Sequence, residues 1–138
     1  MSLQGLVGKN VVAAFWNNGD IYLVFSNYSV DDKKIALLSP EGDCCANVYI
    51  ETVSNPEALI DAQVFSIDDL EFTDEMMAQV ELENSRGPVI DLWGHRINTT
   101  KGTCVLDCRT SHNGYYGGWL ELSWVTEMPK NLAILTEK

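Results

Sequence analysis

The chain has 138 residues, of which 46% are hydrophobic and 21% are charged, with a formal net charge of −11. This composition is typical of one globular domain large enough to bury a core without disulfides, and no run approaches the roughly 18 apolar residues of a membrane span. With 9 Lys and Arg against 20 Asp and Glu, the chain offers no broad basic face for nucleic acid. The start of the chain also lacks the pattern of a secretory signal, so we expect a cytoplasmic protein.

Seven segments have the apolar or alternating pattern of β-strands, and polar segments with Gly, Pro or Asn separate most of them. In chain order they are residues 10–16, 21–25, 34–38, 62–68, 89–97, 103–109 and 119–125. The first two flank Asn18-Gly19, and the fifth and sixth flank a tight turn at residues 98–102. Both arrangements predict β-hairpins.

Three segments carry helix signals. Residues 44–53 fit either a strand or a helix, and we favour a helix of about two turns because Asp43 is a good N-cap residue. Pro56 suits the first turn of a second short helix. The acidic stretch that follows the fourth strand is ambiguous: either the strand continues through Phe72, or a short helix covers residues 74–82.

These elements predict a single α+β domain over residues 1–138, with a mainly antiparallel sheet of about six to seven strands and one or two short helices. Residues 1–8 are expected to form a flexible or tag-derived start, and residues 126–138 a C-terminal tail. The tail would dock through Leu132, Ile134 and Leu135.

The four cysteines occur as Cys44-Cys45 and as Cys104 and Cys108. In a reducing cytosol all four are expected to be thiols, and neither pair has the two-residue gap of a zinc ribbon. On a strand, Cys104 and Cys108 would share one face but lie about 13 Å apart. We therefore predict two buried cysteines there, and neither a metal nor a cofactor.

Two loops are unusual in composition. Residues 111–119 read Ser-His-Asn-Gly-Tyr-Tyr-Gly-Gly-Trp, and residues 42–47 read Gly-Asp-Cys-Cys-Ala-Asn. The first loop could cover the end of the core with its tyrosine rings, or it could be a recognition loop whose tyrosines and Trp119 anchor a partner. A phosphate-binding loop is disfavoured, because no Lys and Ser/Thr pair follows and the loop leads into a strand.

Cys44 and Cys45 are also candidate nucleophiles. A helix N-terminus would stabilise a thiolate at this position, and His112 could act as the base, oriented by Asp43 or Glu51. The alternative is that the two thiols are small packing groups, one buried and one exposed. The sequence alone does not bring the thiols and the imidazole together.

Several of these motifs resemble one family. They are Gly42-Asp43-Cys44-Cys45, Tyr49-Ile50-Glu51, Trp93-Gly94-His95-Arg96-Ile97 with the turn Thr99-Thr100-Lys101-Gly102, and above all Ser111-His112-Asn113-Gly114-Tyr115-Tyr116-Gly117-Gly118 with Leu120-Glu121. The family comprises small uncharacterised proteins of bacteriophages, prophages and their bacterial hosts, classed as a domain of unknown function, and the resemblance spans Gly8 to Val125. Its members commonly have a small polar residue at the position of His112, which weakens a mechanism that needs an imidazole. The resemblance implies the fold type and the importance of both loops, and no activity.

The sequence therefore favours a non-enzymatic, phage- or prophage-associated module that binds a protein partner through the two loops. The predicted binding residues are Asp43, Cys44, Cys45, His112, Asn113, Gly114, Tyr115, Tyr116 and Trp119. A second copy of the chain is the commonest kind of partner for a small domain. Two alternatives stay open: a small thiol-dependent enzyme that uses Cys44 or Cys45, and an acidic mimic of nucleic acid that binds a basic protein.

Overall fold

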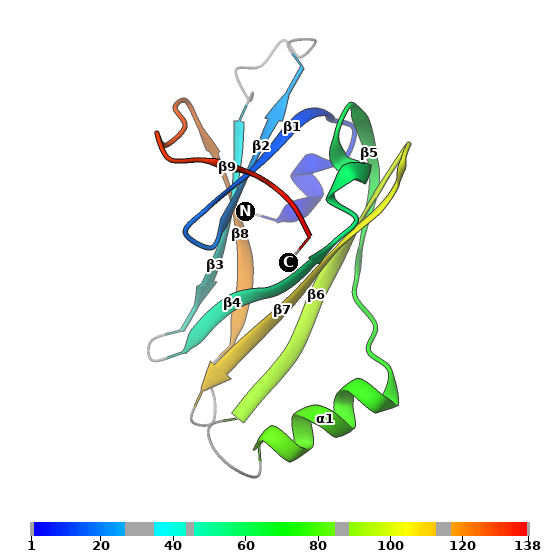
Figure 1. Cartoon of the computed structure of the whole chain (residues 1–138), viewed down its shortest axis with the longest axis vertical. Helices are drawn as coiled ribbons and strands as arrows, with labels where there is room; N and C mark the ends of the chain where they lie inside the picture. The colour runs from blue at the N-terminus through cyan, green and yellow to red at the C-terminus, as the bar shows by residue number, and fades with distance from the viewer. Residues whose placement is uncertain (1, 27–34, 44–45, 85–88, 113–116, 138) are drawn as a thin grey trace.

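The structure, a computed structural model, describes residues 2–26, 35–43, 46–84, 89–112 and 117–137 (Figure 1). Within these residues nine strands form an antiparallel sheet. The strands are β1 (Asn10–Asn17), β2 (Asp20–Phe25), β3 (Ile35–Gly42), β4 (Asn47–Ser54), β5 (Ala62–Asp69), β6 (Val89–Thr99), β7 (Gly102–His112), β8 (Gly118–Val125) and β9 (Ala133–Ile134). The helices are the 3₁₀ helices η1 (Leu3–Leu6) and η2 (Pro56–Leu59) and the α-helix α1 (Asp74–Asn84). The predicted class is confirmed, but the number of strands was underestimated.

The strand order is β4-β7-β6-β5-β1-β2-β3-β8, and β9 pairs with β1. Both predicted hairpins, β1–β2 and β6–β7, are present. Between β1 and β5, the described residues pair only at Asn10 with Gln63 and at Val11 with Ala62. This narrow seam divides the sheet into two halves, β4-β7-β6-β5 and β1-β2-β3-β8.

The inner faces of the two halves enclose one hydrophobic core. Leu23 and Leu38 come from one half, and Ile50, Ile97 and Leu106 come from the other, all of them 0–1% exposed. Burial of this apolar surface is the main contribution to stability. No helix in the described part of the chain is long and apolar enough to cross a membrane.

The two outermost strands of the order, β4 and β8, approach each other in the lower half of Figure 1, above α1. Gly42 and Gly118 form a cross-strand pair between β3 and β8. A Cβ atom on Gly118 would lie 2.3 Å from Thr110 Oγ1 and 2.8 Å from Val48 Cγ2, and one on Gly42 would lie 2.5 Å from Val48 Cγ2. A Cβ atom at either position would therefore require Val48 or Thr110 to shift, and glycine avoids this.

The prediction of a two-turn helix over residues 44–53 is corrected, because Asn47–Ser54 form strand β4 along β7. Ile50 and Val53 are both buried, and a shift in register between Ile50 and Thr52 allows both side chains to face the core. The pairing with β7 supplies the backbone hydrogen bonds that a helix would otherwise have made internally. The N-cap signal was misleading because the carboxylate of Asp43 accepts its hydrogen bond from Gly117 instead.

The other helical predictions are largely confirmed. Pro56 is the first residue of η2, and a helix, not a continued strand, follows residue 73. The hydroxyl of Thr73 accepts a hydrogen bond from the N–H of Met76 (3.2 Å) and thereby caps α1. The helix lies outside the sheet, next to β6 (Figure 1). Val80 is buried, whereas Met77 is 54% and Leu82 61% exposed.

The C-terminal tail docks on β1 through one of the three predicted residues in particular. Leu135 is buried, and its N–H donates to the carbonyl of Ala14 (3.0 Å). Ile134, in contrast, is 72% exposed although it pairs with Phe15. Alternate residues of a strand point to opposite faces, so only one of these neighbours can enter the core.

Gly94 in β6 is a position that only glycine fits, and it provides a test of the sheet packing. A Cβ atom there would lie 2.2 Å from the carbonyl oxygen of Leu106, and a backbone atom cannot move aside as a side-chain end can. We expect Gly94→Ala to lower the free energy of unfolding by about 3 kcal/mol in urea denaturation. In Gly117→Ala the added Cβ would meet Asp43 Oδ2 at 3.6 Å, and we expect a change within about 0.5 kcal/mol. Equal losses in the two variants would contradict the packing at Gly94.

Candidate functional site

The bases of the two unusual loops lie side by side. The N–H of Asp43 donates to the carbonyl oxygen of Gly117 (3.1 Å), and the N–H of Gly117 donates to Oδ2 of Asp43 (2.8 Å). The predicted binding residues at 44–45 and 113–116 lie outside the described residues. The segments that contain them nevertheless leave from positions that are within hydrogen-bonding distance of each other.

Trp119 follows directly after this junction, on β8 opposite Glu41 of β3. Its side chain is 43% exposed, and its indole Nε1 donates to Glu121 Oε2 (3.2 Å). It borders a hollow of about 290 Å³ that His95 and Asp69 also line. Burial lowers the pKa of His95, although the Asp69 carboxylate, 3.9 Å away, opposes this shift. Trp119 is thus an exposed aromatic side chain beside the bases of the two loops.

His112, the proposed base, is the last residue of β7 and is buried. Its Nε2 lies 2.7 Å from Oδ2 of Asp91, a residue of β6 whose side chain is 56% exposed. The sequence had suggested that Asp43 or Glu51 orients the His112 imidazole. The Asp43 carboxylate, however, accepts a hydrogen bond from the N–H of Gly117. The sequence contained only an indirect indication of Asp91, because this residue lies 21 positions from His112 in the chain. The register of β6 and β7 brings the two side chains together.

Cys104 and Cys108 are buried in β7, which confirms the prediction of two buried thiols. Burial raises the pKa of each thiol to about 12. A thiol with such a pKa is neutral at physiological pH and a poor nucleophile. Among the described residues, no group of three or more His, Cys, Asp or Glu side chains is arranged to hold a metal ion.

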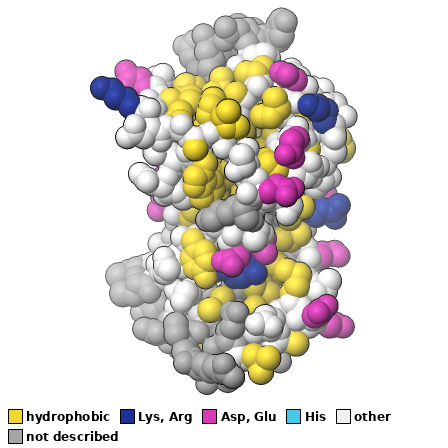
Figure 2. Space-filling model, in the orientation of Figure 1, with side chains coloured by type: hydrophobic (Ala, Val, Ile, Leu, Met, Phe, Trp, Pro, Cys, Tyr) yellow, Lys and Arg dark blue, Asp and Glu magenta, His cyan; other side chains and the backbone are white. Residues whose placement is uncertain are grey.

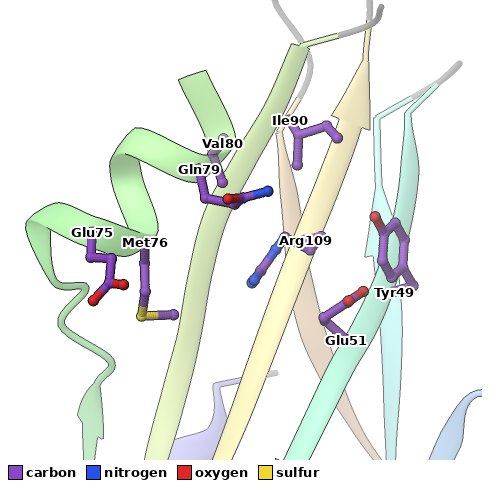
Figure 3. A pocket seen from close by; sticks show the side chains of 8 residues that line it. All are labelled: Tyr49, Glu51, Glu75, Met76, Gln79, Val80, Ile90 and Arg109. Carbon is purple, nitrogen blue, oxygen red and sulfur yellow. The ribbon is translucent and has the colours of Figure 1, made fainter. Parts of the chain in front are cut away.

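A second feature, which the sequence did not indicate, is a groove of about 460 Å³ between α1 and the outer face of the sheet (Figure 3). It is lined by Tyr49, Glu51, Glu75, Met76, Gln79, Val80, Ile90 and Arg109. These residues belong to β4, α1, β6 and β7. We call this feature the α1 groove.

Arg109 lies at the centre of the α1 groove, between the helix and Glu51 (Figure 3). Its side chain is 14% exposed, and its Nη1 forms an ion pair with Asp107 and donates to the carbonyl oxygen of Cys108 (3.0 Å). These contacts fix the guanidinium group against the sheet. The sequence signal was weak because Asp107 and Arg109 look like ordinary outward-facing residues of a strand.

The charged side chains show no single acidic face in the view of Figure 2. There the Asp and Glu side chains are scattered among other residues and are not gathered over one element. A mimic of nucleic acid needs closely spaced carboxylates, because it must reproduce the charge density of phosphates. This face therefore lends no support to that alternative.

A family model described as a domain of unknown function, DUF7448, matches residues 4–122. The chain belongs to the DUF7448 family. The match extends from η1 into β8, so it includes both loops and the α1 groove and leaves β9 outside. No curated protein and no solved structure matches the chain. The expected membership of a family of unknown function is thus confirmed, and the DUF7448 description assigns no activity.

The hydrogen bonds at the loop junction give a prediction for Asp43→Ala. The variant removes the charged acceptor of the Gly117 N–H, a bond of a kind that contributes about 1.5 kcal/mol or more. We expect hydrogen exchange at the Gly117 amide to become at least about tenfold faster by NMR. The Leu70 amide, which donates to the carbonyl oxygen of Gly94 and to neither Asp43 nor Gly117, serves as the internal control. Unchanged exchange at Gly117 would show that the carboxylate does not hold the two loops together.

The raised thiol pKa values give a second prediction. In the native protein at pH 8, we expect iodoacetamide to leave Cys104 and Cys108 unmodified, because both are buried and neutral. In urea both thiols should react at rates set by an ordinary pKa of about 8.5. Mass spectrometry of tryptic peptides measures each thiol separately. Rapid modification of either thiol in the native protein would contradict its burial.

Proposed function

We propose that this DUF7448 domain is a phage- or prophage-associated cytoplasmic protein that acts as a non-enzymatic protein-binding module. Its binding surface consists of the two loops and Trp119. The observation that carries the proposal is the reciprocal hydrogen bonding between Asp43 and Gly117, because it joins two loops of unusual composition at their bases.

The residue types in these loops support protein binding. Tyrosine and tryptophan are enriched among the residues that dominate interface energetics, since they bury a large area with few rotatable bonds. Residues 111–119 contain two tyrosines and Trp119, and Trp119 is 43% exposed beside the junction. Loops held by a rigid sheet are also the usual location of recognition residues.

A photo-crosslinking experiment tests this proposal. We would incorporate p-benzoylphenylalanine at position 119 and, as the control, at Phe65 of β5, which is 60% exposed. After irradiation in the cells that express the protein, we expect a discrete adduct with position 119 and none with position 65. An adduct of twice the chain mass would identify a homodimer. Absence of an adduct at 119, or the same adducts at both positions, would contradict the proposal.

The thiol-enzyme alternative is favoured by one observation, the 2.7 Å contact between His112 and Asp91, because a carboxylate commonly orients a catalytic imidazole. It predicts that alkylation of Cys44 or Cys45 by iodoacetamide persists well below pH 7. On the binding proposal, both thiols should react with an ordinary pKa of about 8.5. If Cys44 or Cys45 reacts well below pH 7 and Asp91→Asn abolishes this reaction, the thiol-enzyme alternative would replace the binding proposal.

A further inference from the structure

The α1 groove shares no lining residue with the loop surface and has the volume of a small-molecule site. Its volume of about 460 Å³ lies within the range of about 300–1,000 Å³ that is usual for ligand pockets. The sheet forms its floor and α1 forms one wall (Figure 3). The groove therefore suits a ligand of a few heavy atoms better than a folded partner.

Charges of both signs line this groove without neutralising each other. Arg109 uses Nη1 for Asp107 and the Cys108 carbonyl, so Nε and Nη2 can still donate to a ligand. Glu51 and Glu75 form no ion pair or hydrogen bond within the described part of the chain. Figure 3 shows them on opposite sides of Arg109.

Apart from the amide of Gln79 and the hydroxyl of Tyr49, the remaining lining is apolar. Met76 and Val80 project from α1, Ile90 from β6 and the ring of Tyr49 from β4 (Figure 3). An aliphatic or aromatic group of a ligand could be buried among these side chains. Removal of its apolar surface from water would then contribute to the binding free energy. Methionine adapts well to ligands of different shape.

We propose that the α1 groove binds a free α-amino acid with an apolar side chain. The carboxylate accepts hydrogen bonds from Arg109, the ammonium group donates to Glu51 or Glu75, and the side chain packs against Met76, Val80 and Ile90. A ligand with only a carboxylate would face two glutamates and a guanidinium whose charge is already balanced by Asp107. A ligand with only an amine would leave the remaining donors of Arg109 unused. A zwitterion satisfies both sets of groups.

NMR titration of the full chain with L-leucine and two analogues tests the proposal without a mutation. Leucinamide lacks the carboxylate, and N-acetyl-leucine lacks the ammonium group. We expect leucine to shift the methyl resonances of Val80 and Ile90 saturably, and each analogue to bind at least about tenfold more weakly. No shift with leucine would overturn the proposal. Equal binding of leucinamide would show that Arg109 does not recognise the ligand, and this too would overturn it.

Conservative variants test the carboxylates. One of the two variants Glu51→Gln and Glu75→Gln should raise the Kd for leucine at least fivefold, because it removes the negative charge that faces the ammonium group. Glu127→Gln, at an exposed position outside the groove, is the matched control and should leave the Kd unchanged. An unchanged Kd in both groove variants would overturn the proposal. Crosslinking at position 119 does not depend on this groove, so the two proposals can fail independently.

Discussion

Close contact between the two ends of the sheet is the constraint on which the rest of the structure depends. Gly42 and Gly118 allow β8 to approach Val48 and Thr110 so closely that a larger residue would require these side chains to shift. This contact brings the turn after β3 to the turn before β8 and makes the hydrogen bonds between Asp43 and Gly117 geometrically accessible. The loop surface is therefore a consequence of how the core is enclosed.

Local sequence signals predicted the elements whose partners are near in the chain. The β1–β2 and β6–β7 hairpins follow from alternating apolar residues around turns such as Asn18-Gly19, where both residues have positive φ angles. Strand β4 was predicted wrongly because its partner, β7, is distant in sequence, and Asp43 resembles a helix cap. The pairing with β7 decided the conformation, as tertiary contacts commonly override local preference.

The same distinction holds for the candidate sites. Both loops were recognisable because their glycines, cysteines and aromatic residues are contiguous in the chain. The α1 groove was not, since Glu51, Glu75 and Arg109 come from three elements and each is unremarkable in its own segment. Likewise, Asp91 contacts His112 only because the register of the β6–β7 hairpin brings them together.

The sheet order also has a consequence for the folding pathway. The β6–β7 hairpin joins neighbouring segments and can form early, whereas β3 must find β8 from the other end of the chain. Contacts between distant segments carry a larger loop-closure entropy and form slowly. Docking of β8 on β3 is thus expected to be a late step. A newly synthesised chain would acquire the joined loops only once β8 is complete, so the binding proposed for these loops would require the finished fold.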